Sequence, residues 1–114
     1  MLADFVRNIC TQLPAVTTDV KWDTNECYLV ANKIFCVISL DEPFSVTLKC
    51  EKEIFNDLIE NDGVAQAPYF IRGQWINIKK PTCFTTTQWH QLITNSYQLI
   101  VAKLSKKEKL LFNL

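Results

Sequence analysis

One seven-residue segment constrains the fold of this chain more than any other. Between Phe44 and Cys50 every second residue is apolar, and the residues between them are serine, threonine and lysine. This period of two is typical of a β-strand with one buried face and one polar face. Lys49 falls on the polar face. The chain therefore contains a sheet whose apolar face must be covered by other elements.

The remaining apolar residues predict three helices and five more strands. Helical spacing predicts helices over 2–12, over about 52–61, and from a cap at Thr86 or Thr87 to at least 104, with a continuation through Phe112 left open. Period-two runs predict strands around Val20 and Trp22 and over 27–31, 34–39, 69–71 and 75–78. Asn32 suits the tight turn of a first hairpin, and Arg72-Gly73-Gln74 closes a second one.

This order of elements predicts an α+β fold. It is helix, four strands, helix, two strands, helix, within one domain that spans 1–114. Parallel strands need long crossovers, and three helices are too few to connect every pair of strands. We therefore expect a largely antiparallel sheet packed against helices on one face. A chain of 114 residues with 48% apolar residues can form one such core but not two.

Composition argues against several classes of protein. No stretch approaches the roughly 18 uninterrupted apolar residues of a membrane helix, and the N-terminus lacks a secretory pattern, so we expect a soluble cytoplasmic protein. The five cysteines form no Cys-x-x-Cys pair and are odd in number, which argues against a disulfide framework or a zinc site. We expect them to be small buried apolar residues.

The sequence contains no set of residues spaced as in a known type of active site. The only histidine, His90, follows Trp89 in the third predicted helix, with no nucleophile at a recognisable spacing. Two glycines are too few for a glycine-rich phosphate loop. We therefore expect a protein that is not an enzyme and that holds no metal or cofactor.

Charge is unevenly distributed, although the net charge is zero. Residues 1–62 carry five basic and eleven acidic side chains, whereas residues 63–114 carry seven basic side chains and one acidic one, Glu108. Such asymmetry is typical of a site for an anionic partner on one side of the molecule. It also fits two halves that attract one another in the folded chain.

Four short signatures follow one another along the chain: Asn32-Lys33-Ile34-Phe35-Cys36, Val46-Thr47-Leu48-Lys49-Cys50, Trp75-Ile76-Asn77-Ile78 and Ser96-Tyr97-Gln98-Leu99-Ile100. In this order they resemble the MmcQ/YjbR family of small bacterial proteins. The resemblance covers nearly the whole chain. It implies a compact α+β fold with a DNA-binding role, in which the two hairpins are the wings of a double-wing arrangement.

Three of these signatures carry residues that match family motifs. Lys33 and Lys49 match the lysines of the family's Gly-Lys-x-Phe and Leu-Lys motifs, with Asn32 where glycine is usual. Asparagine also accepts the backbone of that turn. Ser96 and Tyr97 match a Ser-Tyr pair, which we expect to tie the last helix to the sheet by a hydrogen bond and a large buried ring.

The candidate nucleic-acid site combines basic and aromatic side chains, since cations neutralise phosphates and rings stack on bases. It comprises Lys33, Lys49, Arg72, Trp75, Lys79, Lys80, Lys103 and Lys107, with Tyr69 as a second stacking group. Structural roles are the alternative. Trp75 then belongs to the core, Lys79 and Lys80 form a solvated strand end, and the lysines of the family motifs pair with Glu51, Glu53 or Asp57.

Two functions follow from these patterns. The first is DNA or nucleic-acid binding without catalysis, which requires Arg72, Lys79, Lys80, Lys103 and Lys107 to lie in one patch about 20 Å across. The alternative is a protein-interaction or adaptor module, in which the open sheet face or an edge strand recruits another chain. The basic and apolar tail 106–112 could dock on a partner, a membrane surface or the acidic half of the chain.

Overall fold

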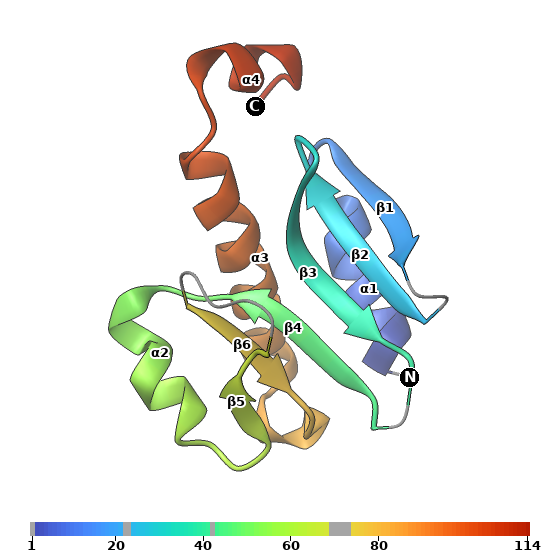
Figure 1. Cartoon of the computed structure of the whole chain (residues 1–114), viewed down its shortest axis with the longest axis vertical. Coiled ribbons are helices and arrows are strands. Elements are labelled where there is room, and N and C mark those ends of the chain that lie inside the picture. The colour runs from blue at the N-terminus through green and yellow to red at the C-terminus, as the bar shows by residue number, and fades with distance from the viewer. Residues whose placement is uncertain (1, 22–23, 42, 69–73) are drawn as a thin grey trace.

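The fold is an antiparallel sheet of six strands with four α-helices, seen here in a computed structural model that describes residues 2–21, 24–41, 43–68 and 74–114. In chain order the elements are α1 (Leu2–Gln12), β1 (Val16–Lys21), β2 (Asn25–Val30), β3 (Lys33–Ser39), β4 (Ser45–Lys49), α2 (Lys52–Ile59), β5 (Val64–Gln66), β6 (Trp75–Ile78), the 3-10 turn η1 (Pro81–Cys83), α3 (Thr86–Ala102) and α4 (Lys106–Leu111). The strands lie in the order β1-β2-β3-β4-β6-β5 (Figure 1). Every neighbouring pair is antiparallel, which confirms the predicted α+β class and order.

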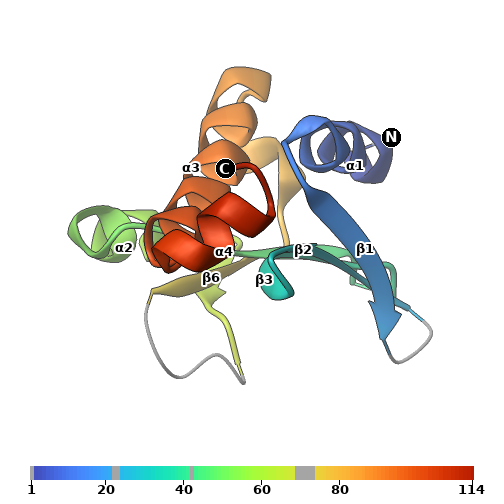
Figure 2. The same cartoon turned by 90° about the horizontal axis from the view of Figure 1, so that it is seen from above.

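The helices cover one face of the sheet and leave the other face open. Figure 2 shows α1 and α3 above the sheet, and α2 packs against β5 and β6. Beneath the helices, Tyr28, Phe35, Leu48 and Ile76 are at most 1% exposed. Val46 and Leu48 of β4 are fully buried, as the alternation predicted, but Ser45 and Thr47 on the opposite face are buried as well and Lys49 is partly buried.

The first hairpin closes with the predicted tight turn. β2 and β3 pair with Val30 opposite Lys33, and the two residues between them, Ala31 and Asn32, have φ of 52° and 63°. Two central residues in the left-handed region twist the turn in the same sense as the strands. Lys33 is thereby fixed at the first position of β3, where its side chain is exposed.

The second predicted hairpin lies partly outside the described residues. The predicted strand 69–71 and the loop residues Arg72 and Gly73 lie outside the described residues. Within the described part of the chain, β6 pairs with β4 on one side and with β5 on the other, where Val64 lies opposite Ile78. A three-residue strand is too short to show a period of two, and the sequence pattern therefore did not predict it.

The last predicted helix is divided into two. Thr85, one residue before the predicted caps, is the N-cap of α3, because Gln88 completes a capping box with it. The Thr85 side chain accepts from the Gln88 amide at 3.1 Å, and the Gln88 side chain accepts from the Thr85 amide at 2.8 Å. A second capping box, Ser105 with Glu108, starts α4.

Four of the five cysteines are buried, as predicted. Cys10, Cys27, Cys36 and Cys50 lie in the interior, Cys83 is partly buried, and all five are free thiols. Burial raises the pKa of Cys50 to about 11, so this thiol is unreactive at neutral pH. Among the described residues, no helix has the length and apolar character that crossing a bilayer requires.

Candidate functional site

The structure separates the predicted site residues into two groups. Lys79 and Lys80 precede η1 at the N-terminal end of α3, whereas Lys103 and Lys107 follow its C-terminal end (Figure 1). The 17 residues of α3 span about 25 Å. The two groups therefore do not share one patch about 20 Å across. Arg72 and Tyr69 lie outside the described residues.

Lys80 and Trp75 are engaged within the fold, as is Lys33, whose partner is given below. The Lys80 ammonium donates to an Asp62 carboxylate oxygen at 2.7 Å, a pair between the basic and acidic halves of the chain. Trp75 is 8% exposed and belongs to the core. Its ring is therefore not an open platform for a base.

Lysines from different elements lie toward the other end of α3, where Lys103 acts on the Lys49 amine and Lys33 pairs with Glu108 of α4. Lys49 ends β4, Lys103 follows α3, and Lys33 begins β3. We call these three residues the lysine cluster. Lys33 also contacts α4, because its ammonium pairs with Glu108 at 3.4 Å.

Ser96 holds α3 against the strands that carry this cluster. Its buried hydroxyl donates to the Phe35 carbonyl at 2.6 Å and accepts from the Lys49 amide at 3.0 Å. One side chain thus connects α3 with both β3 and β4. The predicted role of Ser96 as a tie between helix and sheet is confirmed.

Tyr97, the next residue, fixes the same helix. Its hydroxyl donates to the Pro14 carbonyl at 2.7 Å, and its ring packs edge-to-face on Phe35 with centroids 5.4 Å apart. The predicted structural role of Tyr97 is confirmed as well. The backbone around the lysine cluster is therefore rigidly placed.

The amines of Lys49 and Lys103 are close neighbours. Burial lowers the pKa of the Lys49 amine, and the nearby Lys103 side chain lowers this pKa further. Within the described residues, no carboxylate forms an ion pair with either amine, so the alternative pairing of Lys49 with Glu51, Glu53 or Asp57 does not form. The repulsion between two like charges held together in this way is relieved when an anion binds between them.

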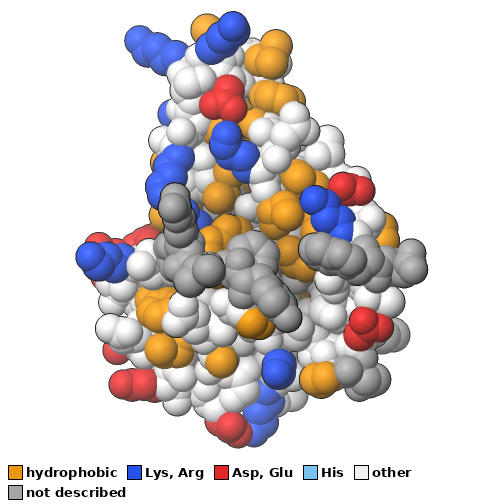
Figure 3. All heavy atoms as spheres, in the orientation of Figure 1, with side chains coloured by type: hydrophobic (Ala, Val, Ile, Leu, Met, Phe, Trp, Pro, Cys, Tyr) orange, Lys and Arg blue, Asp and Glu red, His pale blue; other side chains and the backbone are white. Residues whose placement is uncertain are grey.

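The helix α4 adds positive charge beside the lysine cluster. Its lysines are Lys106, Lys107 and Lys109. Figure 3 shows basic side chains gathered over α4 and the end of α3. The sequence marked this tail as basic, but the neighbouring amines of Lys49 and Lys103 depend on how α3 packs on β4, which no sequence pattern reports.

A separate hollow of about 660 Å³ lies on the open face of the sheet. Its apolar lining includes Cys27, Ile34 and Val37, and its polar lining includes Thr47 and Asn77. The Asn77 amide donates to the Thr47 hydroxyl at 2.8 Å. This is the face that the protein-interaction alternative requires.

Comparison with known proteins assigns the chain to a family. The model of the family described as YjbR matches residues 11–99, most of the chain. The chain belongs to the YjbR family. This confirms the resemblance that its motifs indicated. No curated protein matches this YjbR-family chain.

The fold of the YjbR-family protein recurs in solved structures. Deinococcus radiodurans protein DR2400, with a domain of the family DUF419, has a TM-score of 0.87 at 18% identity, covering 98% of this chain and 88% of that one. A protein from Pseudomonas syringae has a TM-score of 0.67 at 17% identity, covering 85% of this chain and 96% of that one. Identities this low show a common fold alone.

Proposed function

We propose that this YjbR-family protein is a non-enzymatic cytoplasmic protein that binds the phosphate groups of a nucleic acid through Lys33, Lys49 and Lys103. One observation carries the proposal: the adjacent amines of Lys49 and Lys103 form no ion pair with a described carboxylate. Phosphate oxygens form strong charge-assisted hydrogen bonds with such amines. The lysines of α4 extend the basic surface to further phosphates.

This site is expected to contact the backbone of the nucleic acid rather than its bases. Lysines act as point charges, and phosphate contacts carry no sequence information. Trp75, the one described aromatic residue among the predicted contacts, is buried. We therefore expect similar affinities for unrelated sequences of the same length.

The absence of catalysis and the cytoplasmic location belong to the same proposal. His90 is exposed on α3, and its Nδ1 lies 3.5 Å from the Thr94 hydroxyl, longer than the roughly 2.6–3.2 Å at which a base activates a nucleophile. Five free thiols suit a reducing compartment.

The test is fluorescence anisotropy of labelled single- and double-stranded DNA at two salt concentrations. Three neutralised phosphates give an affinity for duplex DNA that falls about 40-fold between about 50 and 200 mM salt. Binding with that salt dependence supports the proposal. No binding at about 50 mM salt contradicts the proposal, and so does an affinity that does not change with salt concentration.

The hollow on the open sheet face supports a second candidate, a protein-interaction module. Its partly exposed Ile34 and Val37 offer apolar contact area, and the uncovered strand β1 offers a free edge for another strand. Under this candidate Val37→Lys abolishes partner binding without changing the melting temperature. If the Val37→Lys variant still binds DNA, the phosphate site lies outside this hollow, and the first proposal is favoured.

A further inference from the structure

Most of the exposed large apolar side chains belong to two surfaces. Of the five among the described residues, Leu110 and Leu111 lie in α4 and are 82% and 76% exposed, and Ile54 lies in α2 and is 36% exposed. Adjacent exposed leucines form a contiguous apolar patch, and such patches mark interaction sites. The α4 leucines therefore need a partner surface.

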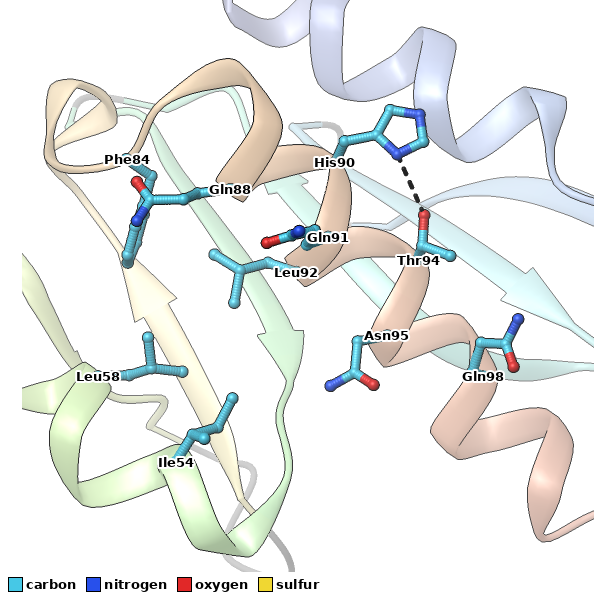
Figure 4. A pocket seen from close by; sticks show the side chains of 10 residues that line it. All are labelled: Ile54, Leu58, Phe84, Gln88, His90, Gln91, Leu92, Thr94, Asn95 and Gln98. Atoms are coloured by element: carbon cyan, nitrogen blue, oxygen red, sulfur yellow. Dashed lines mark hydrogen bonds between the residues drawn. The ribbon is translucent and has the colours of Figure 1, made fainter.

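An apolar groove of about 640 Å³ lies between α2 and α3. Figure 4 shows Ile54 and Leu58 of α2 facing Phe84 and Leu92 across it. The amide side chain of Asn95 lines the same groove from α3. The groove thus has an apolar floor with polar groups at its side.

Acidic side chains lie on α2 and at its two caps, beside this groove. Glu51, Glu53, Asp57 and Glu60 are exposed, and none forms an ion pair with another described residue. Asp57 precedes Leu58 and lies one turn from Ile54, so its charge lies at the edge of the groove. An occupant with apolar side chains flanked by positive charge fits this surface.

The helix α4 has that complementary pattern. Leu110 and Leu111 lie one turn beyond Lys106 and Lys107, and neither lysine forms an ion pair within the described part of the chain. Its N-terminus is fixed by the Ser105 capping box, and at its other end the Leu114 amide donates to the Lys109 carbonyl at 2.7 Å. The helix is therefore formed before any partner binds, which lowers the entropic cost of docking.

We infer that α4 of one copy docks in the groove between α2 and α3 of a second copy, with Leu110 and Leu111 against Ile54 and Leu58. The lysines of α4 then face the carboxylates of α2. Within one chain this contact does not form, because α4 lies beyond the far end of α3 from the groove (Figure 1) and its leucines remain exposed. The contact uses none of the three lysines of the cluster, but it does use the α4 lysines that the proposed function assigns to further phosphates.

Sedimentation velocity on the full chain tests this contact. The wild type should associate as its concentration rises from about 10 µM to 1 mM, the range of a weak interface. Leu110→Gln with Leu111→Gln, and separately Ile54→Gln, should each remain monomeric. Leu40→Gln, which changes an exposed leucine outside both surfaces, is the matched control and should associate like the wild type.

Mixing the two defective variants decides how the copies meet. The leucine variant retains an intact groove and the Ile54→Gln variant retains an intact α4, so an equimolar mixture should form a 1:1 complex. A mixture that stays monomeric contradicts the inference, as does a wild type that is monomeric throughout. Association of Ile54→Gln alone at the wild-type level also overturns it, because α4 would then contact some other surface.

Discussion

At the scale of single residues, the guanidinium of Arg7 joins α1 to β2. Its Nε and Nη2 donate to the two carboxylate oxygens of Glu26 at 3.0 and 2.9 Å, and the Tyr28 hydroxyl donates to the same carboxylate at 2.9 Å. The hydrogen bond from Arg7 lowers the pKa of Glu26. This bidentate ion pair fixes the position of α1 on the sheet.

Arg7→Ala is expected to lower the free energy of unfolding by about 1–2 kcal/mol at neutral pH, because it leaves a partly buried carboxylate without its partner. The folded pKa of Glu26 is lowered, so the stability it contributes is present above the unfolded pKa and is lost as pH falls through the folded pKa. Urea unfolding should therefore show a smaller difference from the wild type at about pH 3 than at pH 7.

The matched control is Asp4→Asn, which removes the exposed partner of Arg7 within α1. It should change stability by less than about 0.5 kcal/mol. A loss in Arg7→Ala that is equal at both pH values would assign the effect to packing of the arginine stem instead.

A second prediction at this scale concerns Lys49. Because burial and Lys103 lower the pKa of its amine, Lys49 should lose its proton at lower pH than the exposed lysines. Folding disfavours the charged form, so stability rises as pH increases through this lowered pKa. An NMR titration of labelled lysine side chains measures the shift directly.

A short oligonucleotide should raise this pKa again, since a bound phosphate stabilises the ammonium. Lys103→Ala should raise it in the free protein. If the pKa of Lys49 in the free protein equals that of the exposed lysines, the proposed arrangement of the lysine cluster is wrong. The same holds if the oligonucleotide leaves the Lys49 pKa unchanged.

At the scale of elements, α3 is the support of the candidate site. Ser96 connects it with β3 and β4 by two hydrogen bonds, and Tyr97 connects it with the turn before β1. The lysine cluster exists because these contacts place the C-terminal end of α3 beside the end of β4. The positions of the amines are thus a property of packing.

Ser96→Ala is expected to destabilise the fold by about 1–3 kcal/mol, because it leaves a buried carbonyl and a partly buried amide without their partner. Thermal or urea unfolding measures the loss. Thr94→Ala, on a half-exposed position of the same helix, should cost less than about 0.5 kcal/mol. Equal stability of the Ser96 variant and the wild type would show that the hydroxyl does not hold α3 to the sheet.

The elements with a clear period could be predicted from sequence, and the site could be predicted only in part. The alternation from Phe44 to Cys50 identified β4, and Asn32 identified the turn that places Lys33. β5 is too short to show a period, and the division between α3 and α4 depends on the Ser105 cap. Lys49 and Lys103 are far apart in sequence, so only the packing of α3 brings them together.

At the scale of the whole molecule, positive charge is divided between the two ends of α3. Lys79 and Lys80 lie before η1 at one end, where Lys80 pairs with Asp62, and the lysine cluster with α4 lies at the other (Figure 1). The acidic helix α2 lies beside α3, at the groove. The charge asymmetry of the sequence therefore does not produce one uniformly basic face.

The measurement that tests the central claim most directly compares two charge-matched variants in DNA binding. Lys49→Gln with Lys103→Gln, and Lys79→Gln with Lys80→Gln, each remove two positive charges, at opposite ends of α3. The first should weaken binding at least about 10-fold at about 50 mM salt and reduce the salt slope by roughly 2, whereas the second should change affinity by less than about 3-fold. Equal losses in both variants, or a loss only in the second, would contradict a phosphate site at the lysine cluster.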